Sequence, residues 1–337
     1  MTASGAGPAH TFRWDLDKTY LRTDFDSLRG LVRAALEKPH EKRAVPGAPA
    51  LIRALREAGG GAHRIAIISG SPEQMRAVLE AKLQLDGVVF DEFVLKPNLK
   101  NLLRARFRAV RAQVPYKLPA LLRSRAAVSA PGETLFGDDA ESDALIYCLY
   151  ADILADRVSR GQLLDVLRAA EAYDDEIERV LALRDDVGKG EAVRRVIIHL
   201  DKRSPTARFD RFGPRLCPVY NYFQAALVLY ADGQLKARDL LTVAREMLAS
   251  RDYTVASLAN SLQDLLLRGR LAREVAVRLG GETASAGAEF SDLPPHAEVV
   301  AAFTKRVQAL GDFRVAAVPA GPDALDYAAL VKSEGMR

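Results

Sequence analysis

The sequence predicts an α/β fold for about the first 205 residues, followed by a mostly helical region. Two observations predict the parallel sheet. Short apolar runs alternate with amphipathic helical stretches, a pattern typical of parallel strands joined by helices on both faces. Acidic and hydroxyl residues follow several of these runs, where ligand sites of parallel sheets lie. With 337 residues, 49% of them hydrophobic, the chain is long enough for two domains.

The first half begins with a short strand at residues 11–14. An amphipathic helix is expected at 26–37 and a second at 46–58, ended by three glycines at 59–61. Together they leave room for a small helical cover, not a large cap domain. A strand at 65–68, a helix from residue 71 and one or two short strands within 88–95 follow.

The first half is expected to continue through a helix opening at 116, a strand ending at 136 and a helix at 144–155. Helices at 162–172 and 175–183 form a predicted insertion of about 159–190. The apolar run 193–200 is expected to be the last strand of the sheet. We therefore expect a first domain of residues 1–205.

Residues 206–337 are expected to form a mostly helical accessory domain. Helices are predicted at 218–230, 237–248 and 254–267, then a linker at about 280–295 and a last helix at 298–310. The stretch 254–271 has a faint winged-helix character, but a helical bundle is the preferred interpretation. No function follows from this half of the sequence.

Four polar features follow one another along the first domain. They are the pair Asp15 and Asp17 after the first strand, Ser69-Gly70 after the second, Lys117 on an amphipathic stretch, and the acidic loop 137–143. Each alone has a plain structural explanation as a turn, a helix cap or a surface lysine. Their fixed order is the specific signal.

The four features in this order resemble the haloacid dehalogenase (HAD) superfamily of phosphohydrolases. The run G-D-D-A-E-S-D-A-L-I-Y at 137–147 is most similar to the App1-type phosphatidate phosphatases. The resemblance implies a Rossmann-like three-layer core with a minimal cap. Arg13 departs from it, since that strand is usually more apolar.

The resemblance implies a role for each carboxylate. Asp15 is the nucleophile that forms an aspartyl-phosphate, and Asp17 is the general acid and base. Magnesium is held by the carboxylate of Asp15, the main-chain carbonyl of Asp17 and the carboxylate of Asp138. Phosphate esters resist nucleophiles because their oxygens are negative, so a bound cation is needed.

The remaining implied roles concern the phosphate. Ser69, backbone N–H groups at Gly70, and Lys117 bind it, and Lys117 also neutralises the nucleophile. Lys96 is a rival for Lys117, which is preferred because its helix leads into the acidic loop. Asp143 would orient Lys117 or a metal-bound water; whether Asp139 or Asp143 is the second acidic residue at the metal stays open.

The expected activity is magnesium-dependent hydrolysis of a phosphomonoester, with a lipid phosphate as one candidate substrate. Two alternatives remain. The chain could be a regulatory or scaffold protein that keeps a phosphate-binding core, or a polynucleotide end phosphatase. Nucleic acid is the weaker partner because no interleaved aromatic residues or nucleic-acid-binding motif accompany the basic residues.

Composition limits the partners further. The net charge of +4 and pI near 9 favour anions without selecting one. Six arginines between 104 and 125 either face solvent or form a basic rim for an anionic surface: Arg104, Arg106, Arg108, Arg111, Arg123 and Arg125. Cys148 and Cys217 are expected to be buried thiols, and no run approaches membrane length. We expect a cytoplasmic protein; its oligomeric state does not follow from the sequence.

Overall fold

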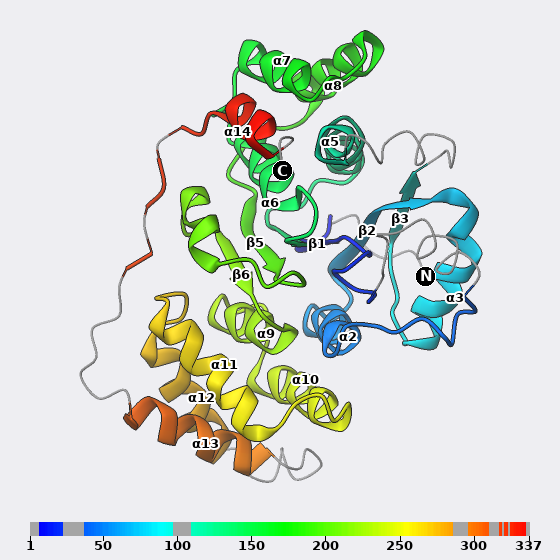
Figure 1. Ribbon diagram of the computed structural model, residues 1–337. Coiled ribbons are helices and arrows are strands. Elements are labelled where there is room, and N and C mark those ends of the chain that lie inside the picture. Colours follow the sequence, from blue (N-terminus) through cyan, green and yellow to red (C-terminus); the bar gives the residue numbers. More distant parts are fainter. Residues whose placement is uncertain are drawn as a thin grey trace.

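A six-stranded, all-parallel sheet forms the centre of the molecule (Figure 1). The computed structural model describes residues 7–22, 37–96, 109–285, 296–309, 317–318, 320–322 and 324–334. The strands, in the spatial order β3-β2-β1-β4-β5-β6, are β1 His10–Trp14, β2 His63–Pro72, β3 Glu92–Lys96, β4 Glu133–Asp138, β5 Val193–His199 and β6 Leu216–Val219. The predicted α/β fold is confirmed.

Helices connect the strands and continue beyond the sheet. Those between strands are α2 Ala48–Ala58, α3 Arg76–Leu85, α5 Ala109–Ala127, α6 Asp143–Leu154, α7 Arg160–Ala169 and α8 Asp174–Asp186, with short 3₁₀ turns at Glu73–Met75 and Thr206–Phe212. After β6 come α9 Tyr222–Ala231, α10 Ala237–Ala249, α11 Val255–Leu267, α12 Arg273–Ser285, α13 His296–Ala309 and α14 Tyr327–Glu334. No helix among the described residues is long and apolar enough to cross a membrane.

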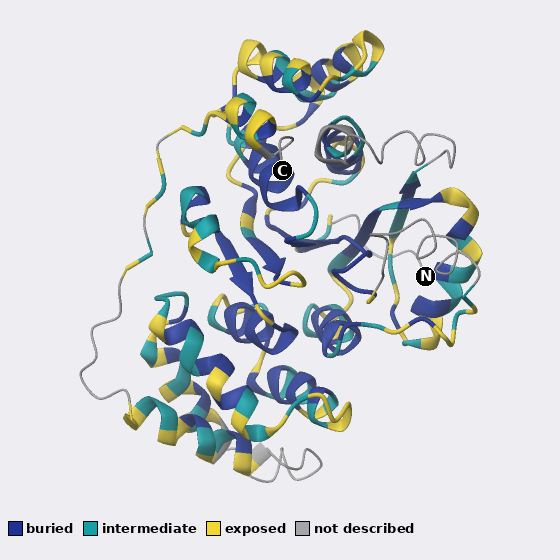
Figure 2. Ribbon diagram, viewed as in Figure 1, coloured by how far each residue is buried: buried dark blue, intermediate teal, exposed yellow. Residues whose placement is uncertain are grey.

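The sheet separates two hydrophobic cores, which makes the fold three-layered. Successive side chains of a strand point to opposite faces. On β5, Val196 and Ile198 accordingly pack with α5 and α6, whereas Ile197 packs with α2 and α9. Figure 2 shows the sheet and the inward sides of these helices as buried.

The second half differs from the sequence-based expectation in three places. The sheet does not end at β5, because Leu216–Val219 adds the edge strand β6 beyond residue 205. Residues 218 and 219 were expected to open a helix; four apolar residues carry too little periodicity to distinguish a strand from a helix. Its proline is tolerated because β6 pairs on one side only.

The other two differences lie nearer the C-terminus. Residues 280–285, expected to belong to a linker, are helical instead, since α12 continues to Ser285; the rest of the expected linker lies outside the described residues. Leu279 anchors that helix in the core, and this burial outweighs the poor helix propensity of the following glycine pair. The last helix, α14, was not expected and returns to pack on α7 and α6.

Some predictions fall on residues that the structure does not describe. The helix expected at 26–37 lies outside the described residues except for its last position. Arg104, Arg106 and Arg108 also lie outside the described residues. Residues 88–90, where a further short strand was possible, precede the single strand β3. Cys148 and Cys217 are free and buried, as expected.

Arg13, which interrupts the apolar pattern of β1, is buried in an ionic network. Its guanidinium binds both carboxylate oxygens of Glu133, with Nε–Oε2 at 2.9 Å and Nη2–Oε1 at 3.0 Å. Arg125 and Tyr150 also donate to Glu133, and Arg13 donates to Ser124 on α5. Although burial favours the neutral acid, Arg13 holds the pKa of Glu133 below its usual range. The network joins β1 and β4 to α5 and α6.

Breaking this pair should destabilise the protein strongly. We expect Arg13→Met to lower the free energy of unfolding by about 3 kcal/mol, because the buried Glu133 carboxylate then loses a positively charged partner. A double-mutant cycle with Glu133→Gln, followed by denaturant unfolding, should show coupling between the two. Arg22→Met is the control, because the Arg22–Asp252 pair is about half exposed and should contribute less than about 1 kcal/mol. Equal losses for the two arginines would contradict the role of burial.

Candidate active site

The carboxyl ends of β1, β2 and β4 bring the predicted residues to one edge of the sheet. Trp14 is in register with Ile67 of β2 and Phe136 of β4, so Asp15, Ser69 and Asp138 follow neighbouring positions. The Asp15 N–H donates to the Phe136 carbonyl at 2.9 Å, which extends the ladder by one residue. The first carboxylate is therefore fixed by the sheet itself.

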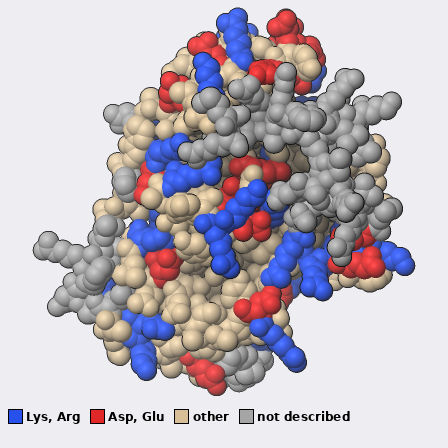
Figure 3. All heavy atoms as spheres, viewed as in Figure 1, with Lys and Arg blue, Asp and Glu red and all other residues tan. Residues whose placement is uncertain are grey.

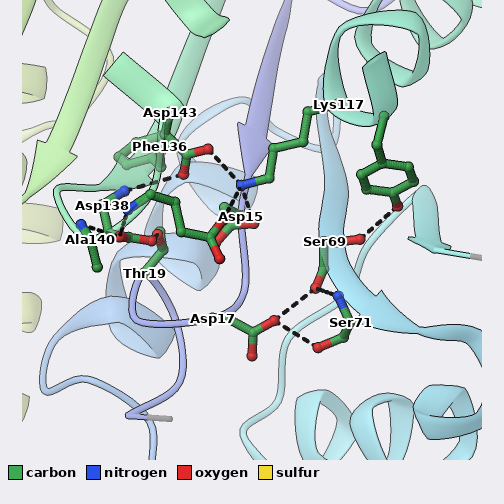
Figure 4. Close-up of polar contacts among 12 residues, drawn as sticks. Asp15, Asp17, Thr19, Ser69, Ser71, Lys117, Phe136, Asp138, Ala140 and Asp143 are labelled. Carbon is green, nitrogen blue, oxygen red and sulfur yellow. Dashed lines mark hydrogen bonds and ion pairs between the residues drawn. The ribbon is translucent and has the colours of Figure 1, made fainter. Parts of the chain in front are cut away.

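Lys117 lies at the centre of the site (Figure 4). Its Nζ atom is 3.0 Å from Asp15 Oδ1, 2.5 Å from Asp143 Oδ1 and 3.0 Å from Glu141 Oε2. It projects from the middle of α5, which begins earlier than the sequence suggested. Lys96 instead lies over the ring of Tyr116, 5.5 Å from the ring centroid. The geometry thus favours Lys117 over its rival.

The charge of Lys117 is set by its carboxylate neighbours. The side chain is fully buried, and burial alone would lower its pKa. Asp143, Asp15 and Glu141 outweigh that effect and raise the pKa of Lys117 well above its usual value. The ammonium group therefore stays protonated and is a permanent cation beside Asp15.

Three buried carboxylates form a cluster suited to a divalent cation. Oxygen atoms of Asp15, Asp138 and Asp143 all lie within 4.8 Å of one another. Asp15 Oδ2 accepts no hydrogen bond from the described residues, and Oδ1 meets only the Lys117 ammonium. Burial raises the pKa of Asp15 and of Asp138 well above the usual value. A hard cation with oxygen ligands, such as Mg²⁺, would satisfy these atoms.

Two carboxylates of the acidic loop point in different directions. Asp143 turns inward, where its Oδ2 accepts from the Asp138 N–H at 3.3 Å. It packs on Gly137, where a Cβ atom would lie 2.4 Å from Asp143 Oδ2, so a larger residue would displace it. Asp139 turns away and accepts the N–H groups of Lys202 and Ser204, at 2.8 and 2.9 Å. Asp143, and not Asp139, therefore joins the cluster.

Asp17 lies apart from the other carboxylates. Its Oδ2 accepts from the hydroxyls of Ser69 at 3.1 Å and Ser71 at 2.6 Å (Figure 4). Burial raises the pKa of Asp17 to about 6, and the two serine hydrogen bonds moderate the rise. This carboxyl group therefore titrates near neutral pH, as a general acid or base requires. Gly70 lies within β2, and its expected contact with phosphate through a backbone N–H group stays a prediction.

Three contributors were missed by the sequence-based interpretation. Ser71 binds Asp17, Glu141 binds Lys117, and the Thr19 hydroxyl donates to Asp138 Oδ2 at 3.4 Å. Glu141 lies in the predicted acidic loop and Thr19 just after the predicted pair of aspartates, but neither was given a role, and Ser71 was interpreted as the start of a helix. Ser69 contacts Asp17, so its predicted phosphate contact remains a prediction.

No protein-family model, curated protein or solved structure matches this chain.

The crowding of carboxylates should cost the metal-free protein stability. We expect Asp138→Asn to raise its free energy of unfolding by about 1 kcal/mol, roughly 2 °C in melting temperature. The amide oxygen can still accept from the Ala140 and Glu141 N–H groups, while the repulsive charge is gone. Thermal unfolding with and without Mg²⁺ tests this, because the variant should also lose any stabilisation by the cation.

The pH dependence of that gain has a defined sign. A carboxyl group whose pKa is raised in the folded state stabilises the protein at low pH and loses this contribution as pH rises. The benefit of Asp138→Asn should therefore be largest above neutral pH and shrink on acidification, where protonation removes the same charge. A gain that is independent of pH would contradict the electrostatic explanation.

Proposed function

We propose that this chain is a magnesium-dependent phosphohydrolase of the HAD type that cleaves a phosphomonoester through an aspartyl-phosphate on Asp15. One observation carries the proposal. The buried Lys117 ammonium lies against Asp15 and Asp143, while Asp17, two residues after Asp15, is held separately with a pKa of about 6. A nucleophile beside a fixed cation, with an acid close by, is what phosphoryl transfer needs.

In the first step a carboxylate oxygen of Asp15 attacks phosphorus and the bond to the leaving oxygen breaks. Asp17, in its protonated form, donates a proton to that oxygen, so an alcohol departs. In the second step Asp17, now ionised, accepts a proton from a water molecule that attacks the phosphorus. The acyl-phosphate bond breaks, phosphate is released and Asp15 is regenerated. Lys117 offsets the negative charge of Asp15 and the phosphoryl oxygens throughout.

The proposed cation is Mg²⁺. The carboxylates of Asp15 and Asp138 would hold it, together with the Asp17 main-chain carbonyl that the HAD resemblance implies, and Asp143 adjoins these groups. When bound, it would neutralise charge on the phosphoryl oxygens and align the phosphoryl group with the nucleophile. Asp15 Oδ2, which has no hydrogen-bond partner among the described residues, supports this assignment.

The substrate is proposed only as a class. The similarity of residues 137–147 to App1-type enzymes favours a lipid phosphate. In the face shown in Figure 3, the coloured basic side chains lie among acidic ones and form no single-sign patch. That face gives no added support for docking on an anionic membrane or nucleic acid, so a mixed substrate panel is the appropriate experiment.

The proposal is tested by phosphate release. The panel comprises phosphatidate, a phosphoprotein, sugar phosphates, nucleotides and DNA ends, each with Mg²⁺ and with chelator. We expect Mg²⁺-dependent release from at least one class, and Asp15→Asn should reduce it to background because the amide is not a nucleophile. The variant should remain folded, since the amide oxygen can still face Lys117.

Silence across the panel from folded wild-type protein would overturn the proposal and favour a regulatory or scaffold role. Release that is strongest on single-stranded DNA ends and falls steeply with salt would favour the polynucleotide alternative.

The serine contacts of Asp17 predict a shift in the pH profile. For an alkyl phosphate, kcat/KM should fall above pH about 6 as Asp17 loses its proton. The Ser71 hydroxyl stabilises the ionised form, so Ser71→Ala should raise the pKa and move the descending limb upward by roughly one pH unit. Ser159→Ala, which removes a distant helix cap, is the control and should leave the limb unchanged. A downward shift in Ser71→Ala would contradict the assignment of Asp17.

A further inference from the structure

The loop that follows Asp15 has a strained residue at its centre. Lys18 has φ of 59°, in the left-handed region that non-glycine residues seldom adopt. Such a conformation persists only where surrounding contacts hold it, and it is often found at functional sites. The φ angle of Lys18 also sets the plane of the peptide bond to Asp17. Whatever holds Lys18 therefore orients Asp17.

Two hydrogen bonds from distant parts of the chain hold this loop. The Lys18 N–H closes a local turn onto the Leu21 carbonyl at 2.8 Å. The Lys18 carbonyl accepts from His199 Nδ1 at 2.9 Å, and the next carbonyl, that of Thr19, accepts from the Tyr222 hydroxyl at 2.6 Å. His199 ends β5 and Tyr222 begins α9. Neither belongs to the four motifs.

The protonation states of both donors are fixed by their surroundings. A carbonyl oxygen only accepts, so the proton of the His199 ring is on Nδ1. Burial lowers the pKa of His199, which keeps the ring neutral, and raises the pKa of Tyr222 well above its usual value. Tyr222 therefore keeps its hydroxyl proton, and both residues donate throughout the physiological range.

A stack of rings fixes the direction of these donors. The Tyr222 ring lies between those of His199 and Trp14, with centroid separations of 5.4 and 5.6 Å. Trp14 in turn stacks on Phe136 at 3.8 Å. Trp14 directly precedes Asp15, and Phe136 accepts the Asp15 N–H. The same strands that carry the nucleophile thus align the Tyr222 hydroxyl.

We propose that Tyr222 and His199 are positioning residues of the active site. By holding two successive carbonyls, they keep the Thr19 hydroxyl on Asp138 and the Asp17 carboxyl on its two serines. The inference rests on the proposed function. It extends that function by assigning Tyr222, from the helical region beyond residue 205, a part in holding the active site. Without either donor, a buried carbonyl is unsatisfied and the loop rearranges to pair it again.

Magnesium binding by the metal-free full-length protein, measured by calorimetric titration, is the primary test. Tyr222→Phe keeps the ring stack and removes only the hydroxyl. We expect its Mg²⁺ affinity to fall about tenfold or more, the usual effect of losing a group that orients metal ligands. Tyr327→Phe is the matched control, because it removes a 2.6 Å hydroxyl contact to Asp152, distant from the site, and should leave Mg²⁺ affinity unchanged.

His199 allows a second comparison. His199→Phe keeps a ring but removes the donor, whereas the amide of His199→Asn can replace Nδ1. We expect weaker Mg²⁺ binding in the first and partial recovery in the second, with unfolding midpoints measured for all variants. Wild-type Mg²⁺ affinity in both Tyr222→Phe and His199→Phe would overturn the inference, even if both unfold at lower temperature.

The outcome is separable from that of the proposed function. If the wild type binds Mg²⁺ but releases no phosphate, the proposed function fails. The Mg²⁺ affinities of the variants still test the positioning roles of Tyr222 and His199. If the wild type binds no Mg²⁺, the positioning inference fails, and the proposed function is then tested by phosphate release alone.

Discussion

The site depends on one buried ammonium group. Lys117 contacts carboxylates from the end of β1, the acidic loop and the start of α6, and without it the buried Asp15 and Asp143 carboxylates could not remain charged. Burial raises the pKa values of these carboxyl groups, and the charge of the neighbouring carboxylates, which the single positive charge of Lys117 does not balance, raises them further. The remaining negative charge is what makes the site suited to a divalent cation, and the same imbalance is expected to cost the metal-free protein stability.

A second contact keeps Lys117 in place. Arg13 on β1 and Asp15, just beyond its end, are two residues apart and face α5 together. Ser124 and Lys117 are seven residues, or two turns, apart on one side of that helix. Arg13 donates to Ser124 as Lys117 pairs with Asp15, so strand and helix are joined at two points. The arginine that departs from the apolar pattern of the strand thus fixes the alignment of the helix that carries Lys117.

The sequence predicted Asp15 and Asp138 at the ends of strands, which a parallel sheet brings to one edge, and the order of the motifs selected Lys117. It could not predict Tyr222, whose spacing in an apolar helix is that of a core residue, or His199, which ends an apolar strand. Their contacts with Lys18 and Thr19 join residues about 180 and 200 positions apart in the sequence, and local sequence patterns do not predict contacts of this kind. The edge strand β6 was missed for a related reason, since its four residues acquire their structure by pairing with β5.

The most direct measurement is a search for the covalent intermediate on Asp15. The phosphomonoester cleaved fastest would be mixed with enzyme and Mg²⁺, quenched in acid and treated with borohydride, which reduces an acyl phosphate of aspartate to homoserine. Mass spectrometry should find homoserine at position 15, more of it in Asp17→Asn because the second step is slowed, and none with chelator. Phosphate release with position 15 unmodified, and a different residue phosphorylated or none, would contradict the account.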